Sequence, residues 1–440
     1  MTTNRFVVDQ LGIPSRSNPI KKHGSFNFID DEERLLVSPH TTALNECLEA
    51  GQEPESFELA GPREKIFFEP GKNRAAIVTC GGLCPGLNSV IRGLVLQLWF
   101  NYDCRDILGI RFGYHGLGNQ GQQPRPLTPK DVSNIHRQGG TMLGSSRGTP
   151  PTEEIVDNLE RLGINMLFTI GGDGTMRGAT SIWNEVRKRG LDISVIGIPK
   201  TIDNDIPFVR RAFGFDTAVG IAAESINSAQ IEAWGAPGGI GIVKLMGRHS
   251  GYIAATAALA SGHANFCLVP EVPFSLEGKN GLFELIEKRL EQKGDAVIVI
   301  AEGAGQYYFE SPDREVDASG NKKLGDIGVY IRDRLKAHLK GKGITNAIKY
   351  IDPSYLIRSA PANSSDQLYC LRLAQNAAHA AMAGKGGMLI GFWHGQITHV
   401  PMEALSGLSR QVNPKGELWF NILESTGQPD QIGDITYIET

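Results

Sequence analysis

Cysteine, long apolar stretches and net charge are all scarce in this sequence of 440 residues. Six cysteines in so long a chain do not make a disulfide framework, and Cys80 and Cys84 have no second pair of cysteines or histidines to complete a zinc site. No apolar run reaches the about 18 residues of a membrane-spanning helix, and Met1–Gln10 lacks the apolar core of a signal peptide. The net charge of −4 gives no electrostatic argument for a nucleic-acid or membrane-surface partner. We therefore expect a cytoplasmic protein with reduced thiols.

Apolar residues and glycine, by contrast, are plentiful. Hydrophobic residues make up 41% of the chain and charged residues 21%, which is typical of a globular enzyme. The length is sufficient for two or three domains, each with its own core. The 53 glycines favour an α/β protein in which many backbone turns approach a ligand.

The most informative stretch is Thr169–Asp205. Asn165–Ile170 and Ser194–Ile198 are apolar runs that predict strands, and Met176–Arg189 between them has helical spacing. This pattern is typical of a βαβ unit, in which both strands end at the same edge of a parallel sheet. Ligands of such sheets bind outside the carboxyl ends of the strands, so we expect the two polar turns to face one site.

The residues of these two turns suit phosphoryl transfer. Glycines at 171, 172 and 174 leave backbone N–H groups open to a phosphate, and a helix that begins at Thr175 adds its N-terminus. Asp173 is a candidate Mg²⁺ ligand, Asp203 a candidate base, and Lys200 a candidate charge for the transition state. Each residue alone also fits an ordinary role, as a tight turn, a capping aspartate or a surface lysine. Their shared place after two predicted strands favours the functional interpretation.

Two further glycine-rich segments belong to the same half of the chain. Arg74–Cys80 predicts a buried strand, a glycine turn follows it, and Ser89–Phe100 then has helical spacing. Gly82 in that turn would let the backbone approach an anion. Gly139–Gly148 is rich in small residues and contains one charge, Arg147, which suits a bridging phosphate. A plain turn and a surface arginine are the alternatives.

The second half of the chain, from about Gly214, repeats the alternation of helix and strand. Strands predicted at Gly239–Leu245 and Ala296–Ala301 are followed by Arg248 and Glu302, which would suit the phosphate and the hydroxyl groups of a sugar phosphate. A structural salt bridge between neighbouring strands is the alternative. The remaining predicted elements are helices at Thr217–Ala233, His249–Ser261, Leu282–Glu291, Asp326–Lys340 and Leu368–Ala383, strands at Asn265–Pro270 and Gly387–Trp393, and a polar segment at Lys349–Ser365.

At five motifs the sequence resembles the 6-phosphofructokinases. They are Gly81–Asn88, Gly171–Thr175, Pro199–Asp205, Lys244–Arg248 and Tyr355–Arg358. The glycine motif also occurs in NAD kinases and diacylglycerol kinases, whereas Thr201–Asp205 together with Met246-Gly247-Arg248 is far more specific. The resemblance implies an α/β fold with two Rossmann-like domains, each with a parallel sheet, and an active-site cleft between them. We place an N-terminal extension at 1–70, as an oligomer contact or a loosely docked tail, a phosphoryl-donor domain at 71–213 with 359–410, and a fructose 6-phosphate domain at 214–358 with 411–440.

The resemblance also implies a role for each motif residue. Asp203 would be the general base and Asp173 the Mg²⁺ ligand, with Thr201, Arg248 and Lys200 completing the catalytic group. The residues implied to hold ATP are Gly82, Arg147, Gly148, Gly172, Asp173, Gly174 and Thr175. Those implied to hold fructose 6-phosphate are Thr201, Ile202, Asp203, Met246, Gly247, Arg248, Glu302, Lys349, Tyr355 and Arg358.

Departures from the bacterial ATP enzymes indicate a branch of the family. Lys200 and Tyr355 resemble the pyrophosphate-dependent enzymes, but Gly174 does not, because those enzymes carry an aspartate there. The combination resembles the ATP-using plant and trypanosomatid members, which as a rule are homotetramers and some of which are allosteric. Gly239 and Lys349 each stand where the bacterial enzymes have an arginine, so one expected phosphate contact is missing.

The sequence thus predicts Mg²⁺-ATP-dependent phosphorylation of fructose 6-phosphate at O1, a step of glycolysis. The first alternative is the same reaction with pyrophosphate as donor. A lipid or NAD kinase is disfavoured by the Thr201–Asp205 turn and by Met246-Gly247-Arg248. A non-catalytic regulatory subunit is disfavoured because Asp173 and Asp203 are both present.

Overall fold

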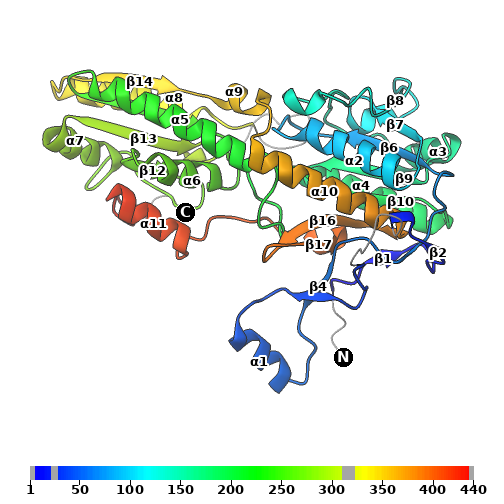
Figure 1. Ribbon diagram of the computed structural model, residues 1–440. Helices are drawn as coiled ribbons and strands as arrows, with labels where there is room; N and C mark the ends of the chain where they lie inside the picture. Colours follow the sequence, from blue (N-terminus) through cyan, green and yellow to red (C-terminus); the bar gives the residue numbers. More distant parts are fainter. Residues whose placement is uncertain (1–4, 21–27, 310–322, 436–440) are drawn as a thin grey trace. The chain divides into compact units, whose positions relative to one another are not determined.

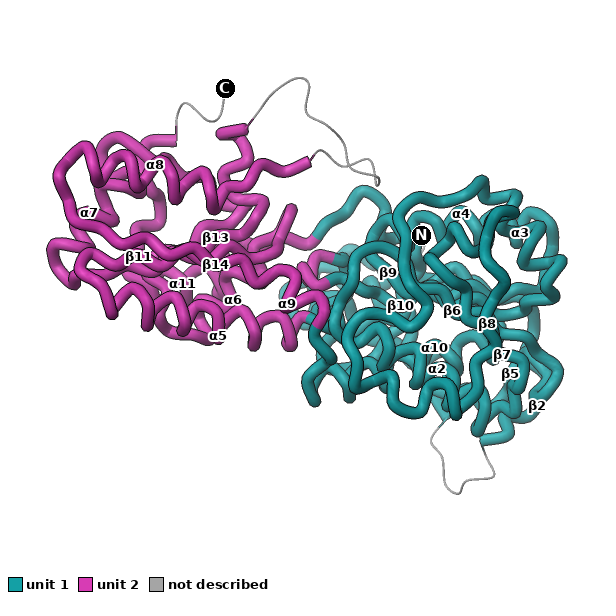
Figure 2. Tube along the Cα trace, turned by 90° about the horizontal axis from the view of Figure 1, so that it is seen from above, with its two compact units in different colours: residues 1–201, 206–214, 360–409 teal, residues 202–205, 215–359, 410–440 magenta. Residues whose placement is uncertain are grey.

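The structure is a computed structural model that describes residues 5–20, 28–309 and 323–435. The chain forms two compact units (Figure 2). Unit 1 comprises Met1–Thr201, Ile206–Gly214 and Ala360–Ser409, and unit 2 comprises Ile202–Asp205, Phe215–Ser359 and Arg410–Thr440. Among the described residues, no helix is both long and apolar enough to cross a membrane.

Unit 1 is built on a sheet of nine strands in the order β3-β4-β17-β16-β10-β9-β6-β7-β8. Its five central strands run parallel, and every residue of β9 and β10 is buried. Strands covered on both faces read as continuous apolar runs, which is why the sequence reveals them. The central strands are β6 (Arg74–Thr79), β7 (Asp106–Ile110), β9 (Met166–Gly171), β10 (Ser194–Pro199) and β16 (Met388–Trp393).

Helices cover both faces of this sheet. α2 (Leu87–Asn101) and α10 (Ser364–Met382) pack together on one face, and α3 (Thr152–Arg161) and α4 (Asp173–Arg189) pack together on the other (Figure 2). α4 begins at Asp173 rather than at Thr175 or Met176, so Asp173 lies in its first turn. The sequence did not predict α3.

Unit 2 has a smaller sheet of four parallel strands in the order β12-β13-β11-β14. Its core has two parts, one formed with α5 and α6 and the other with α7 and α8. The strands are β11 (Gly239–Leu245), β12 (Phe266–Leu268), β13 (Asp295–Ala301) and β14 (Ala347–Ile351). The helices are α5 (Phe215–Trp234), α6 (Tyr252–Ser261), α7 (Leu282–Lys293), α8 (Ile327–Gly341), α9 (Ser354–Ser359) and α11 (Glu417–Thr426).

Two predictions about the architecture need correction. The sheet of unit 1 is not wholly parallel, because β17 (Gln396–Pro401), β4 (Ser56–Leu59) and β3 (Arg34–Leu36) add to it in antiparallel fashion, as does β8 (Arg125–Pro126) at the other edge. Residues 34–36 and 56–59, within the predicted N-terminal extension, therefore pair with this sheet. Between them lies α1 (Thr41–Glu49), which has no buried residue and stands away from the sheet (Figure 1).

A cluster of buried charges joins this N-terminal part to the sheet. Glu58 on β4 is 4% exposed and contacts Arg63, Lys385 and His399, at 2.6, 3.2 and 2.8 Å respectively. Burial alone would raise the pKa of Glu58, but the hydrogen bond from His399 and the charges of Lys385 and Arg63 hold it well below its usual range. Burial lowers the pKa of His399, so its ring donates to Glu58 as a neutral imidazole near pH 7. Glu58 is thus the buried anion beside two buried cations, which the half-exposed Asp31 also contacts, at 2.6 Å from Arg63 and 3.1 Å from Lys385.

Replacing Glu58 with alanine should leave Arg63 and Lys385 without their buried anion, and with only the half-exposed Asp31 as a counter-charge. Removing one partner of a buried ion pair typically costs about 3–5 kcal/mol in the free energy of unfolding. Glu55→Ala is the control, because it breaks an exposed pair with Arg5 and should cost less than about 1 kcal/mol. Urea denaturation measures both, and equal effects would show that the buried cluster is not a structural anchor.

Candidate active site

Three strands of unit 1 end level with one another and place their following turns at one edge of the sheet. Thr79 of β6 is opposite Ile170 of β9, and Gly171 of β9 is opposite Pro199 of β10. The turns that begin at Gly81, Gly172 and Lys200 therefore follow at the same edge. A main-chain hydrogen bond of 2.9 Å from Lys200 N to Gly171 O joins two of them directly.

A fourth segment, Ser145–Arg147, joins this edge. Gly81 N donates to Ser146 O at 3.1 Å, and the Ser145 hydroxyl donates to Gly81 O at 2.6 Å. Gly81 has a φ of +80°, and a Cβ there would lie 3.2 Å from Lys200 Nζ. The buried ammonium group of Lys200 thus lies close against the glycine turn. The structure brings together four segments that the sequence singled out separately.

The glycines at this edge leave open space. A Cβ on Gly82 would meet no atom within 4 Å, and one on Gly174 would meet only the Arg177 guanidinium at 3.8 Å. Neither glycine has a positive φ, so neither backbone conformation requires glycine. Gly174 lies in the first turn of α4 beside Asp173, whose exposed carboxylate forms an ion pair with Arg177. Thr175 is buried and packs over Gly171.

Unit 1 also contains a cavity of about 490 Å³, and two of the candidate residues, Arg147 and Gly148, line it. Most of its walls come from the segment around the 3₁₀ helix η2 (Gly113–Leu117) and from the start of α3. The lining residues are His115, Gly118, Asn119, Gln120, Arg147, Gly148, Thr149, Pro150 and Glu154. The sequence analysis missed His115, Asn119 and Glu154, because no local motif marks them.

In unit 2, β11 and β13 also end level, with Leu245 opposite Ala301. Glu302 N donates to Leu245 O at 2.8 Å and Gly303 N to Gly247 O at 3.0 Å, so Glu302 lies against the Met246–Arg248 turn. Gly247 has a φ of +128°, and a Cβ on Gly303 would lie 1.9 Å from Arg248 O. Glycine is therefore required at both positions.

Glu302 lies within a group of basic side chains. Burial raises the pKa of the Glu302 carboxyl, and the charges of Arg358, Lys244 and Arg248 oppose that rise. Lys244 pairs with Asp352 at 2.9 Å and with Asp326 at 3.3 Å. The sequence analysis gave Lys244 no site role, although it is the first residue of the Lys244–Arg248 motif. The group as a whole suits a ligand with hydroxyl groups and an anionic end.

The Ile202–Asp205 turn belongs to unit 2, although the sequence placed it in the donor domain. The Ser250 hydroxyl donates to Asp203 O at 3.1 Å, which ties this turn to the segment that follows Arg248. Asn204 is 4% exposed and has a φ of +58°. Lys200 and Thr201 remain in unit 1, so the chain passes from unit 1 to unit 2 within the Pro199–Asp205 motif.

Of the remaining candidates, Tyr355 and Arg358 lie together, and Lys349 and Gly239 lie elsewhere. The Arg358 guanidinium is 5.3 Å from the centre of the Tyr355 ring on α9. Lys349 is opposite Gly241, four residues and about 13 Å before the end of β11, and it pairs with Glu232 at 3.4 Å. A Cβ on Gly239 would lie 1.8 Å from Ala233 O of α5, so this position has no room for the family's arginine.

Replacing Gly303 with alanine should destabilise unit 2, because the new methyl group would push against the carbonyl of Arg248. Overpacking of this kind costs about 1–3 kcal/mol in the free energy of unfolding. Gly174→Ala is a matched control, because its Cβ has space and alanine favours a helix. Urea denaturation compares the two variants, and a Gly303→Ala protein as stable as the control would contradict the crowding.

Comparison with known proteins extends these observations. Residues 74–381 match the family model described as phosphofructokinase. The chain is 49% identical to an ATP-dependent 6-phosphofructokinase of Borreliella burgdorferi, over 96% of this chain and 97% of the relative. It is 45% identical to an ATP-dependent 6-phosphofructokinase of Trypanosoma brucei brucei, over 97% and 88% respectively. A pyrophosphate-dependent phosphofructokinase from Marinobacter aquaeolei has the same fold, with a TM-score of 0.67 and 20% identity over 82% of this chain and 92% of that one. The chain therefore belongs to the phosphofructokinase family.

Proposed function

We propose that this protein transfers the γ-phosphoryl group of ATP to O1 of fructose 6-phosphate, giving fructose 1,6-bisphosphate and ADP, a committed step of glycolysis. Eight relatives, 43–49% identical over more than nine-tenths of this chain, all carry names that specify ATP dependence. The observation that carries the proposal is the edge of β6, β9 and β10, where glycine turns and Lys200 meet and from which the chain runs directly into Asp203. The last of the turns that form this phosphate cradle is thus followed directly in the chain by the proposed base.

The donor would bind to unit 1. Gly82, Gly172 and Gly174 leave room for phosphate oxygens, the N-terminus of α4 with Thr175 favours an anion, and Arg147 adds a guanidinium. The 490 Å³ cavity that starts at Arg147 and Gly148 is of the size of small-ligand sites, and we assign it to the nucleoside. Asn119, Gln120 and Glu154 offer hydrogen-bonding groups there.

Asp173 fits a Mg²⁺ ion that arrives with the nucleotide. The described residues contain no group of three or more His, Cys, Asp or Glu side chains that could hold a metal by themselves. Mg²⁺ in kinases is usually bound through one or two carboxylates together with substrate phosphates, which a single exposed aspartate beside the phosphate cradle satisfies. When bound, the ion neutralises charge on the phosphates.

The acceptor would bind to unit 2. Glu302 and the Met246–Arg248 turn would hold the sugar, with Ile202 and Thr201 on its reacting side. Arg358, Tyr355 and, as an addition from the structure, Lys244 would face its 6-phosphate. Lys349 lies away from this group in its own chain, so we propose that it serves the site of a neighbouring subunit.

In the reaction, Asp203 would accept the proton of the O1 hydroxyl as the oxygen attacks the γ-phosphorus. Lys200 and Arg147 would stabilise the charge on the transferred group, since both carry positive charge at the donor edge. Arg248 would orient the sugar. The protein's contribution is thus position and charge, as is general in phosphoryl transfer.

We further propose that the enzyme is a cytoplasmic homo-oligomer, a tetramer as in the branch it resembles. Unit 2 exposes large apolar side chains on α5 and on α9, and these two helices are in contact with each other. Ile231 and Trp234 are 67% and 80% exposed, and Tyr355 and Leu356 are 80% and 69% exposed. Exposed apolar groups of this size suit a protein–protein contact.

The role of Asp203 can be tested by Asp203→Asn, which keeps the shape and removes the proton acceptor. Turnover should fall on the order of 10²–10⁴-fold, with little change in the apparent affinity for fructose 6-phosphate. Asp192→Asn, the same change at an exposed position before β10, should leave turnover intact. Steady-state kinetics with a coupled assay give the comparison, and near-normal turnover of Asp203→Asn would remove it from this role.

The choice of donor can be tested at Gly174. An aspartate there would repel the α-phosphate of ATP, so Gly174→Asp should lose at least ~10-fold in ATP-dependent kcat/KM and admit at most weak pyrophosphate use. Gly174→Ala adds a carbon without charge in open space, and should keep far more activity with ATP. Both variants and the wild type are assayed with both donors. A wild type that prefers pyrophosphate would refute the proposed donor, and equal losses in the two variants would assign the effect to bulk.

A further inference from the structure

The catalytic turn is held in unit 2 by a segment more than 200 positions later in the chain. Arg410 N donates to Asp205 O at 2.8 Å, and Arg410 Nη1 donates to Asn204 O at 3.3 Å. The two carbonyl groups that follow Asp203 therefore both accept hydrogen bonds from Arg410. Asn204 has a φ of +58°, a conformation that a non-glycine residue keeps only when its surroundings hold it.

Arg410 is itself fixed by Tyr252, the first residue of α6. Its guanidinium carbon lies 4.5 Å from the centre of the Tyr252 ring, a cation–π contact. The Tyr252 hydroxyl donates to Gln411 O at 2.6 Å, and Gln411 Nε2 donates to His249 O at 3.1 Å. Position 410 is thus joined to the segment between Arg248 and α6.

The buried carboxylate of Glu271 joins the segment after Arg410 to the segment before α6. Glu271 Oε1 accepts from Val412 N at 2.7 Å and from Gly251 N at 2.9 Å. Burial raises the pKa of Glu271, against the effect of these hydrogen bonds. Next to Gly251, Ser250 donates to Asp203 O. The contacts form a closed ring that runs from Asp203 through Ser250, Gly251, Glu271, Val412 and Arg410 back to Asn204 and Asp205.

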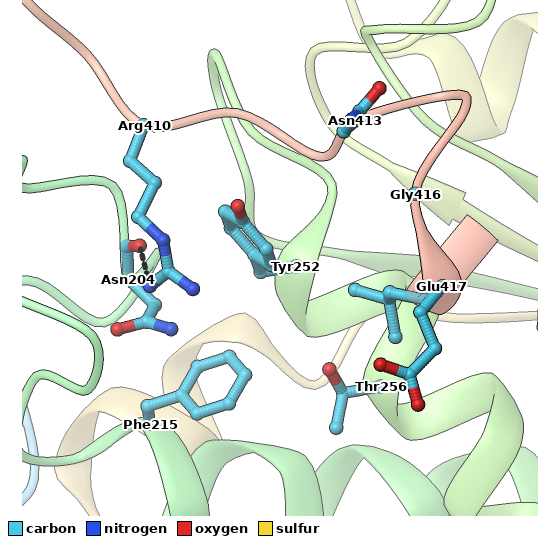
Figure 3. Close-up of a pocket in the computed structure, with 9 residues that line it drawn as sticks. Asn204, Phe215, Tyr252, Thr256, Arg410, Asn413, Gly416 and Glu417 are labelled. Carbon is cyan, nitrogen blue, oxygen red and sulfur yellow. Dashed lines mark hydrogen bonds between the residues drawn. The ribbon is translucent and has the colours of Figure 1, made fainter. Parts of the chain in front are cut away.

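Beside this ring lies a cavity of about 330 Å³ (Figure 3). Figure 3 shows the Arg410 side chain reaching toward Asn204 with the Tyr252 ring alongside, and Phe215, Thr256 and Glu417 around the space. Because this space is open, neighbouring side chains would not fill the place of a shortened residue 410. A truncation there therefore removes the guanidinium bond to Asn204 O without replacing it, while the main-chain bond from Arg410 N to Asp205 O remains.

We propose that Arg410 is a positioning residue that fixes the main chain of Asn204 and Asp205 and thereby sets the orientation of the Asp203 carboxylate. The proposal rests on the proposed function, in which Asp203 is the base. In this role Arg410 would act through the turn rather than on a substrate. Removing the Arg410 side chain should therefore lower kcat rather than raise KM. The size of this decrease should depend on whether the Asp203 carboxylate is present.

The test is a double-mutant cycle of Arg410→Ala and Asp203→Asn, read by steady-state kinetics with ATP and fructose 6-phosphate. Misplacement of a reacting group by about 1 Å costs up to ~10²-fold, so Arg410→Ala should lower kcat by about 10–100-fold while both KM values stay within about threefold. In the Asp203→Asn background the same change should cost less than about threefold, because the group it positions is gone. Equal effects in the two backgrounds, or a loss that lies mainly in KM, would overturn the proposal.

Two further variants keep the test decisive if Arg410→Ala folds poorly. Tyr252→Phe keeps the ring under Arg410 and loses only the hydroxyl bond to Gln411, so kcat should fall by about 2–10-fold with unchanged KM values. Arg105→Ala is the control. It removes an arginine that stacks on the Trp99 ring in unit 1, remote in sequence from Arg410, and should leave kcat unchanged. A Tyr252→Phe enzyme with wild-type kcat would contradict the ring of contacts. If the wild type itself has no turnover with these substrates, the proposed function fails before any variant is compared.

Discussion

The register of the parallel strands is the constraint on which both halves of the site depend. In unit 1, β6, β9 and β10 end at one level, so the turns that begin at Gly81, Gly172 and Lys200 meet without any long loop. In unit 2, β11 and β13 do the same for the Met246–Arg248 turn and Glu302. A slip of one residue in either sheet would turn these groups to the opposite face, and the buried apolar runs of the strands prevent such a slip.

The glycines that follow these strands, in unit 1 and in unit 2, fall into two classes. Gly81, Gly247 and Gly303 are required by the fold, through a positive φ or through contact with a neighbouring backbone. Gly82 and Gly174 have neither constraint and are surrounded by space. At these two positions a glycine is not needed by the fold, and the space beside each is what the proposed donor site uses.

The strands of the two cores could be predicted because parallel strands covered on both sides are continuous apolar runs, as β9 and β13 are. β14 could not, because none of its five residues is fully buried and Lys349 and Tyr350 break the apolar pattern. The motif residues were found from local spacing, whereas the cavity residues His115 and Glu154 carry no local signal. The assignment of residues 202–205 to unit 2 depends on Ser250 and Arg410, and contacts so distant in sequence leave no trace in a local pattern.

The brief passage of Ile202–Asp205 through unit 2 also determines how this fold can be recombined. The four residues lie near the end of the run 1–214, which otherwise belongs to unit 1, yet hydrogen bonds join them to Ser250 and Arg410. A chimera that takes unit 2 from one relative and unit 1 from another should therefore carry 202–205 together with 215–359 and 410–440. A fusion with a single crossover after Gly214 would instead combine the 202–205 turn of one parent with the anchoring segment of the other.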